Sequence, residues 1–338
     1  PGCQLSASSP GYVEKAYQFL RDVFPDEGVG LMLRCCGAPA DWAGRKDLYT
    51  ASQAEFYTAY EQMGRPKLVL ACSSCYQSFK THAPDIEILS FWELFDQYGP
   101  QQLGDRKSHA PVAVHDPCST RYEARIQDAV RNILKKMGCV IEELPLSREK
   151  TECCSYGGLM WLANRPVAEK VVQRRIAESK QDYVTYCAMC RDFFARRGKR
   201  TLHLLDLIYG APGDDAAAAP PVGFSQRHEN RARLKAKLLS ELWSETMPDQ
   251  QAFESIRLII PEPVQQIIED RLILVEDVQK VIEYAERTGK RMYNTANGHF
   301  LAYYKPNTVT YWVEYTPQEG AFLIHKAYSH RMEIGLGG

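Results

Sequence analysis

Ten of the eleven cysteines in this 338-residue chain fall into two sets that have the same internal order. Each set contains a single cysteine, then an adjacent Cys-Cys pair, then a Cys-x-x-Cys motif. The first set is Cys3, Cys35, Cys36, Cys72 and Cys75, and the second is Cys118, Cys153, Cys154, Cys187 and Cys190. Neighbouring cysteines make a strained disulfide with each other, and clustered thiols in a long chain favour metal binding in a reducing compartment. The pattern therefore predicts two sulfur-rich metal sites.

The number of cysteines in each set indicates which kind of metal site they form. A structural zinc ion takes four ligands, and an ordinary cubane iron–sulfur cluster takes four cysteines. A fifth thiolate indicates a cluster in which one sulfur bridges two irons. Zinc and buried structural thiols stay open as alternatives, although burial does not explain a five-cysteine order that occurs twice. Cys139 stands outside both sets, and we expect it to be a packing residue.

The cysteines repeat at a nearly constant offset along the chain. Cys118 follows Cys3 by 115 residues, Cys153 follows Cys35 by 118, and Cys187 follows Cys72 by 115. Flanking residues recur with them, because LVLACSSCYQSF at 68–79 resembles YVTYCAMCRDFF at 183–194. A fixed offset over several landmarks indicates a duplicated unit of about 100 residues.

Strands and helices are predicted to alternate within the first unit. Apolar spacing predicts helices over 11–24, 48–63 and 75–82, strands over 28–33 and 67–71, and a short strand followed by a helix within 85–98. This alternation is typical of an α/β fold with largely parallel strands. Each Cys-x-x-Cys motif then falls where a strand leads into a helix, and there the free N–H groups stabilise a thiolate.

The region after the second unit has no cysteine and a different pattern. It predicts helices over 225–245 and within 261–289, and aromatic-rich strands over 299–306, 309–317 and 321–334. We therefore expect a first repeat at 1–104, a second repeat at 105–208, an exposed linker at 209–224 rich in Ala, Gly and Pro, and a small α+β domain at 225–338 that serves docking or structure. His299, His325 and His330 lie among aromatic residues, which favours a packed sheet or docking surface over a metal site.

Composition excludes several classes of protein. A net charge of −1 gives no electrostatic case for binding nucleic acid, and no apolar run reaches the roughly 18 residues of a membrane span. The start of the chain has no signal-peptide pattern. The sequence also has no flavin or dinucleotide fingerprint, so we expect electrons to come from a partner, which is a flavoprotein, a ferredoxin-like subunit or another segment of a longer chain. The sequence begins PGCQ without a Met. Either Met was removed before Pro1, or the sequence is a piece of a longer polypeptide, and both explanations stay open. The basic run at 191–200 predicts a solvated helix end, with an anion site as the alternative.

The full cysteine pattern, C-x(31)-C-C-G-x(34)-C-x-x-C and its copy, resembles the CCG domain family, which is typified by the B subunit of heterodisulfide reductase. The resemblance implies two noncubane [4Fe–4S] clusters, one on each cysteine set. It also implies that Gly37 lets the backbone approach the cluster, while Pro39 and Pro117 shape the loops that present cysteines. The second motif reads Cys-Cys-Ser, and we expect Gly157 and Gly158 to supply the missing backbone freedom.

The resemblance further implies a disulfide reductase subunit that acts on a small disulfide or thiol. Electrons would be exchanged with a flavoprotein or a ferredoxin-like subunit in a hetero-oligomer, in the cytoplasm or at the periphery of a membrane complex. His115 is the candidate proton donor, with a hydrogen bond to backbone or to a cluster sulfide as the alternative. The competing function is a non-catalytic electron-relay subunit of a larger dehydrogenase or membrane-associated redox complex.

Overall fold

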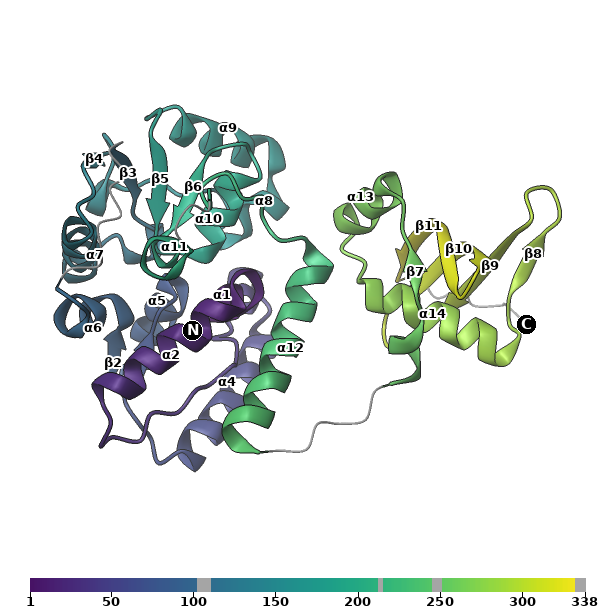
Figure 1. The fold of residues 1–338 in the computed structure, drawn as a ribbon, viewed down its shortest axis with the longest axis horizontal. Coiled ribbons are helices and arrows are strands. Elements are labelled where there is room, and N and C mark those ends of the chain that lie inside the picture. Colours follow the sequence, from purple (N-terminus) through teal and green to yellow (C-terminus); the bar gives the residue numbers. More distant parts are fainter. Residues whose placement is uncertain (102–110, 212–214, 245–250, 332–338) are drawn as a thin grey trace. The chain divides into compact units, whose positions relative to one another are not determined.

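The computed structural model describes residues 1–101, 111–211, 215–244 and 251–331 (Figure 1). The chain forms two compact units, Pro1–Val222 and Gly223–Gly338. The predicted boundary between the two repeats, at 104 and 105, lies outside the described residues. No helix within these ranges is long and apolar enough to cross a membrane.

The first repeat contains six helices and two short strands among its described residues. The helices are α1 (Cys3–Ser8), α2 (Pro10–Val23), α3 (Ala38–Trp42), α4 (Lys46–Gln62), α5 (Ser73–His82) and α6 (Phe91–Tyr98). Strands β1 (Leu68–Leu70) and β2 (Ile88–Ser90) pair in parallel. The predicted helices and these two strands are confirmed, but the predicted strand over 28–33 is wrong, because that segment lies outside any helix or strand. Gly28 and Gly30 weaken its strand propensity, and no described strand pairs with it.

The second repeat is built on a four-stranded parallel sheet of order β4-β3-β5-β6. Its strands are β3 (Val112–His115), β4 (Ile141–Glu143), β5 (Asp182–Thr185) and β6 (Thr201–His203). Its helices are η1 (Cys118–Thr120), α7 (Ala124–Lys136), η2 (Arg148–Lys150), η3 (Gly157–Leu159), α8 (Met160–Ala163), α9 (Arg165–Ile176), α10 (Ala188–Ala195) and α11 (Leu204–Tyr209). All four residues of β3 are buried, as expected for a central parallel strand covered on both faces. The predicted α/β fold with two repeats and parallel strands is confirmed.

Part of the predicted linker packs against this second repeat. Ala217 is buried, and its carbonyl oxygen accepts a hydrogen bond of 2.9 Å from the Thr201 N–H. Arg191 donates to the carbonyl oxygens of Ala216 and Ala219. Ala-rich composition predicted an exposed segment, but small side chains also allow close packing, so the expectation of exposure is wrong for these residues.

The second unit is an α+β fold with a five-stranded sheet of order β7-β11-β10-β9-β8. Its strands are β7 (Leu258–Ile259), β8 (Met292–Asn294), β9 (His299–Tyr304), β10 (Thr310–Gln318) and β11 (Ala321–His330), and its helices are α12 (Phe224–Trp243), η4 (Ala252–Ser255), α13 (Glu262–Asp270) and α14 (Val275–Thr288). The antiparallel β9–β10–β11 meander matches the prediction, whereas β7 and β8 were not predicted. Helices α13 and α14 share a core with the sheet through Ile268, Val281 and Tyr315.

The three histidines of this sheet pack among its aromatic side chains. His299 stacks on His325 with ring centroids 3.7 Å apart, and its Nδ1 lies 2.7 Å from Glu314 Oε1. His330 Nε2 instead accepts a hydrogen bond from the Trp312 indole. These contacts agree with the favoured interpretation of a packed aromatic sheet.

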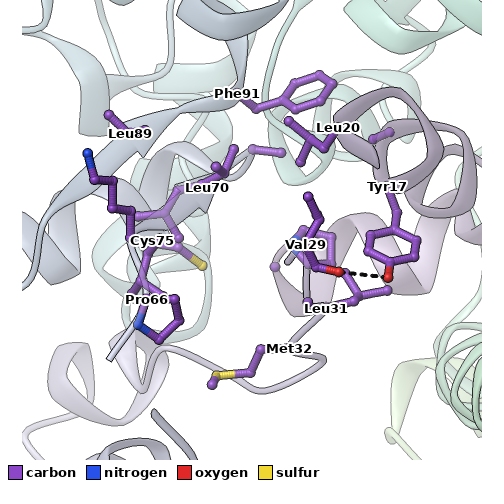
Figure 2. Close-up of a pocket in the computed structure, with 18 of the residues that line it drawn as sticks. Tyr17, Leu20, Val29, Leu31, Met32, Pro66, Leu70, Cys75, Leu89 and Phe91 are labelled. Atoms are coloured by element: carbon purple, nitrogen blue, oxygen red, sulfur yellow. Dashed lines mark hydrogen bonds between the residues drawn. The ribbon is translucent and has the colours of Figure 1, made fainter. Parts of the chain in front are cut away.

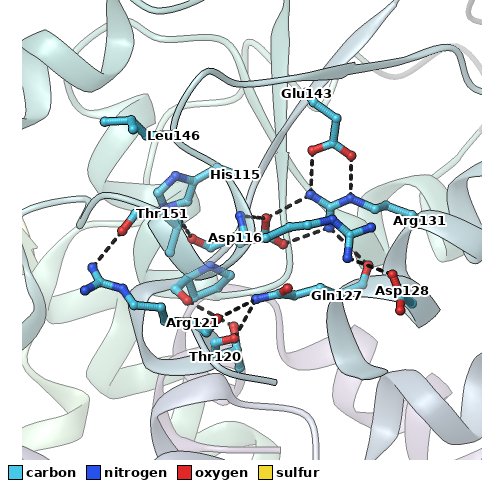
Figure 3. Close-up of polar contacts among 12 residues, drawn as sticks. His115, Asp116, Thr120, Arg121, Gln127, Asp128, Arg131, Glu143, Leu146 and Thr151 are labelled. Carbon is cyan, nitrogen blue, oxygen red and sulfur yellow. Dashed lines mark hydrogen bonds and ion pairs between the residues drawn. The ribbon is translucent and has the colours of Figure 1, made fainter. Parts of the chain in front are cut away.

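A buried ion pair fixes the loop that carries Cys118 in the second repeat (Figure 3). Arg131, which is 4% exposed, donates to both oxygens of the fully buried Asp116 at 3.0 and 2.9 Å, and also to Glu143. The Tyr186 hydroxyl and the Arg148 N–H donate to the same Asp116 carboxylate at 3.0 and 2.9 Å. Burial alone would raise the pKa of Asp116, but the hydrogen bonds and charge of Arg131 outweigh it and lower the pKa.

Replacing Asp116 by Asn should destabilise the chain by about 3–5 kcal/mol, because Arg131 would keep its charge in the core without a full counter-charge. Urea unfolding of the anaerobically prepared chain measures this loss. Asp128→Asn is the matched control, since its pair with Arg148 is exposed and should contribute less than about 1 kcal/mol. Equal losses in the two variants would contradict a special role for the buried pair.

His203 is a second buried polar group, at the start of α11. Its Nδ1 accepts a hydrogen bond of 3.2 Å from the Leu205 N–H, and Asp206 Oδ2 accepts one of 2.7 Å from the His203 N–H. Burial, with a smaller contribution from the charge of Arg191, lowers the pKa of His203 to about 3. The side chain is therefore neutral in the folded state at any pH well above that value.

This lowered pKa predicts acid sensitivity with a definite sign. The unfolded chain takes up a proton on His203 below its ordinary pKa of 6.5, while the folded chain does so only near 3. Titration of His203 therefore costs no stability above about pH 6.5. As the pH decreases from 6.5 toward 3, it lowers the free energy of unfolding by up to about 1.4 kcal/mol per pH unit. His203→Asn keeps a helix-capping acceptor but cannot titrate, so its unfolding free energy should fall less steeply between pH 6.5 and 4.5. Parallel curves for the two proteins would refute this assignment.

Candidate metal centre

The two Cys-x-x-Cys motifs begin helices directly after parallel strands. Cys72 is the N-cap of α5 just after β1, and Cys187 is the N-cap of α10 just after β5. Hydrogen bonds from the Cys75 side chain and from the N–H groups of Cys75 and Ser74 lower the pKa of Cys72 to about 6, against the opposing effect of burial. The start of this helix therefore favours a thiolate, which is the form that binds metal.

In both repeats the residue after the adjacent pair has the same left-handed φ angle. Gly37 follows the first pair with φ 79°, and Ser155 follows the second pair also with φ 79°. The Gly37 N–H donates to Cys35 Sγ at 3.4 Å, and the Ser155 N–H donates to Cys153 Sγ at 3.2 Å. The expectation that Gly157 and Gly158 replace the missing glycine is therefore corrected, because the left-handed residue is Ser155 itself, at a cost of about 1–2 kcal/mol.

Sulfur atoms make the same chain of contacts in each set. Cys3 Sγ lies 4.0 Å from Cys35 Sγ, and its counterpart Cys118 Sγ lies 3.6 Å from Cys153 Sγ. The contacts continue from each adjacent pair to the Cys-x-x-Cys motif, and Cys154 Sγ lies 3.4 Å from Cys190 Sγ. In the first set the order of contacts is Cys3, Cys35, Cys36, Cys75, Cys72, and in the second it is Cys118, Cys153, Cys154, Cys190, Cys187.

Nine of the ten cysteines line one cavity between the two repeats of the first unit. They are Cys3, Cys35, Cys36, Cys72, Cys75, Cys118, Cys154, Cys187 and Cys190. The cavity is also lined by Pro39, Pro117 and Gly157, which were predicted, and by Trp42 and Met189, which were not. The tenth cysteine, Cys153, contacts Cys118 directly. The structure thus brings the two predicted sets to a common space.

The two predicted site glycines contact different neighbours. A Cβ on Gly37 would lie 2.9 Å from the Tyr49 ring, so the left-handed backbone favours glycine and the close packing against Tyr49 excludes a larger residue unless that ring moves. A Cβ on Gly157 would lie 3.5 Å from Cys153 Sγ and 3.6 Å from Cys118 Sγ, which places the Gly157 backbone against two site sulfurs.

His115 lies in the core beside the second set. Its ring is fully buried, its Nδ1 accepts a hydrogen bond of 3.2 Å from Arg175 Nε, and Phe194 packs edge-on against it. Burial and then the charge of Arg175 lower the pKa of His115 to about 3. The imidazole is therefore neutral at neutral pH and has no extra proton to donate there, so the contacts favour a structural role. Cys139 lies just before β4, and burial raises the pKa of its thiol.

The basic run at 191–200 is held by internal partners. Arg197 donates to Glu169 and packs over Trp161, Lys199 donates to the Ser179 carbonyl oxygen, and Arg200 pairs with two carboxylates. The interpretation as a solvated helix end is therefore wrong for the Arg197 and Lys199 side chains, which are buried, whereas the exposed Arg200 agrees with it. Asp116 and Arg131 were not predicted from the sequence. The only signal for Asp116 was that it is a charged residue directly after an apolar strand.

The residues present fit an iron–sulfur cluster in their donor chemistry. Such clusters are held by cysteine thiolates and tuned by hydrogen bonds to their sulfurs. Ser73, next to Cys72, and Ser155, next to Cys154, each have a buried hydroxyl with no hydrogen-bond partner, and a group rich in acceptor sulfur would give these hydroxyls partners. Within the described residues, no three Cys, His, Asp or Glu side chains are grouped as ligands of a single metal ion.

Comparison with known proteins identifies the cysteine-rich segments. A curated EtfAB:quinone oxidoreductase from Syntrophomonas wolfei subsp. wolfei (strain DSM 2245B / Goettingen) is 26% identical over 180 residues, which cover 48% of this chain and 25% of that protein. The chain thus spans about a quarter of that relative's length, and no solved structure matches it. Residues 1–80 and 112–194 match the family described as the CCG cysteine-rich domain. The chain therefore contains two copies of the CCG cysteine-rich domain, one in each of these two segments.

Proposed function

We propose that this chain is an iron–sulfur redox subunit that binds two [4Fe–4S] clusters of the noncubane type and reduces or forms a disulfide. The observation that carries the proposal is the single cavity lined by cysteines of both sets. Two separate relay clusters have no need of a shared space. A disulfide has two sulfur atoms, and a cavity with a sulfur site on each side can present one site to each of them.

The cavity wall suits an organic disulfide with apolar substituents. Trp42, Tyr156 and Met189 line it together with Pro39 and Pro117, and Tyr156 also packs against Phe193. These side chains can hold the carbon skeleton of a substrate while the cysteines face its sulfur atoms. Bound clusters would supply one-electron exchange, so that a disulfide, two electrons and two protons give two thiols.

Electrons must reach these sites from a partner protein or from another segment of a longer chain. We infer a flavoprotein or a ferredoxin-type subunit in a hetero-oligomer, and the similarity to a protein named EtfAB:quinone oxidoreductase supports a redox partner. Such an assembly would function in the cytoplasm or at a membrane surface.

The second candidate is an electron-relay subunit that performs no chemistry on a disulfide. The same similarity favours it, because that relative is named as a quinone oxidoreductase. In that case the shared cavity would have no substrate, and electrons would pass only between protein partners.

The cluster assignment predicts about eight iron and eight sulfide per anaerobically prepared chain, from two four-iron clusters. Cys36→Ser and Cys154→Ser should each reduce the iron content to about half, because each removes a ligand from one set only. Cys139→Ser is the matched control and should keep the full content. Colorimetric iron and sulfide analysis measures all four proteins, and a chain that contains only zinc would rule out both candidate functions.

The disulfide proposal predicts that the chemically reduced chain is reoxidised by a small dialkyl disulfide, with release of two thiols per disulfide. Met189→Phe should fill the cavity and slow this step by about tenfold or more, equivalent to ~1.4 kcal/mol, with its iron content unchanged. Met160→Phe, in α8 and away from the cavity wall, is the control. Stopped-flow absorbance and thiol titration give the rates, and no reoxidation by disulfide would favour the relay function.

A further inference from the structure

Within the described residues, six buried side-chain polar atoms have no hydrogen-bond partner, and five of them belong to the second repeat. These five are His115 Nε2, Arg121 Nε, Ser155 Oγ, Arg175 Nη2 and Thr185 Oγ1, and the sixth is Ser73 Oγ in the first repeat. Buried polar groups in folded proteins normally have a partner, so each such atom calls for an explanation. Their unequal distribution indicates that the two cysteine sets have different polar surroundings.

His115 and Thr185 are neighbours on the face of the sheet that contacts the second cysteine set. They are the last residues of β3 and β5, and the two parallel strands pair them directly. Side chains alternate between the two faces of a strand, so both lie on the same face as Ala113 and Tyr183, two residues earlier. That face packs against sulfur, because Ala113 and Tyr183 belong to one core cluster with three cysteines of the second set.

The Arg175 side chain determines which nitrogen of His115 carries the proton. Its Nε–H donates to His115 Nδ1 at 3.2 Å, and a guanidinium group has no acceptor atom. Nδ1 must therefore accept, which places the single proton of the neutral ring on Nε2. Arg175 is itself held in place, because its Nη1 donates to the Leu146 carbonyl oxygen at 2.7 Å and to Glu178 at 2.6 Å. The Nε2–H is thus a fixed donor in the core that has no protein partner.

The corresponding strand position of the first repeat is apolar. The offset of 115 residues makes Leu70 of β1 the counterpart of Thr185. Leu70 lines a cavity of about 590 Å³ together with Leu20, Leu89 and Phe91 (Figure 2). A leucine in such surroundings has no hydroxyl to donate. The unpartnered hydroxyl at the end of β5 is therefore specific to the second set.

We propose that the His115 Nε2–H and the Thr185 hydroxyl donate hydrogen bonds to the iron–sulfur cluster of the second cysteine set and thereby raise its reduction potential. This inference rests on the proposed two-cluster function. Reduction adds one electron from the redox partner to the cluster, and no proton leaves His115 in this step. Hydrogen bonds to the sulfurs of a cluster tune its potential, and they favour the reduced form because it carries one more negative charge.

The experiment is a redox titration of the anaerobically prepared 338-residue chain, followed by electron paramagnetic resonance. Cys36→Ser and Cys154→Ser chains should each keep one cluster, and they assign the two midpoint potentials. Thr185→Val removes the hydroxyl at nearly constant volume, and His115→Leu removes the N–H. Each should lower the ratio of reduced to oxidised second cluster at a fixed potential by about threefold to tenfold, where tenfold is about 59 mV for one electron. The first potential and the iron content should not change.

Two further variants separate hydrogen bonding from a general loss of packing. Thr185→Ser keeps the hydroxyl and should restore the potential of the original chain. Thr201→Val is the matched control, because this buried hydroxyl on the neighbouring strand β6 donates to the Lys199 carbonyl oxygen at 2.9 Å, and both potentials should stay unchanged.

The possible failures of this inference and of the two-cluster function can be told apart. An unchanged second potential in Thr185→Val with full iron content would overturn the inference alone, and so would an equal shift in Thr201→Val. If His115→Leu loses its iron, the Thr185 variants still decide the question. An original chain without two clusters would instead overturn the proposed function.

Discussion

Ten thiols collected at one place are the constraint on which the first unit depends. Contacts among the sulfur atoms shift their pKa values in both directions. Hydrogen bonds with neighbouring cysteines and burial together raise the pKa of Cys75, Cys154 and Cys190, whereas the hydrogen bond from Cys75 lowers the pKa of Cys72. A protein can hold such a group only if separate segments present the sulfurs from fixed backbone positions. The two helix starts after β1 and β5 and the two left-handed turns supply those positions. Both turns and the helix start at Cys72 also direct N–H groups at sulfur. The α/β architecture is therefore suited to this chemistry because strand ends and helix starts meet at one edge.

The two repeats meet this constraint with unequal support. In the second repeat a buried salt bridge, a central strand and the edge-to-face pair of Tyr183 and Phe194 surround the cysteine loops. In the first repeat the sheet has two strands among the described residues, and Cys35 is exposed whereas its counterpart Cys153 is half-buried. Because of this difference in packing, we expect the second cysteine site to be more rigid than the first.

Local patterns in the sequence were sufficient to predict most of the helices, the parallel-strand architecture and the proximity of the cysteines within each set. Apolar spacing and strand–helix alternation depend only on near neighbours, and so does the position of Cys72 and Cys187 at helix starts. The segment 28–33 could not be predicted correctly, because its apolar character does not specify which strand lies beside it. Asp116 gave little signal for a similar reason, since its partner Arg131 lies on a helix and contributes only after folding.

Ser155 shows how the site overrides local preference. A serine rarely adopts φ 79°, and here its hydroxyl is also buried without a protein partner. Neither feature lowers the energy of the isolated turn. The backbone conformation is explained if it serves to direct the Ser155 N–H at Cys153, as the Gly37 N–H is directed at Cys35. The buried hydroxyl is explained if it faces a group that accepts hydrogen bonds. The strain at Ser155 therefore arises from the sulfur site, and a glycine would relieve the backbone while removing that hydroxyl from the site.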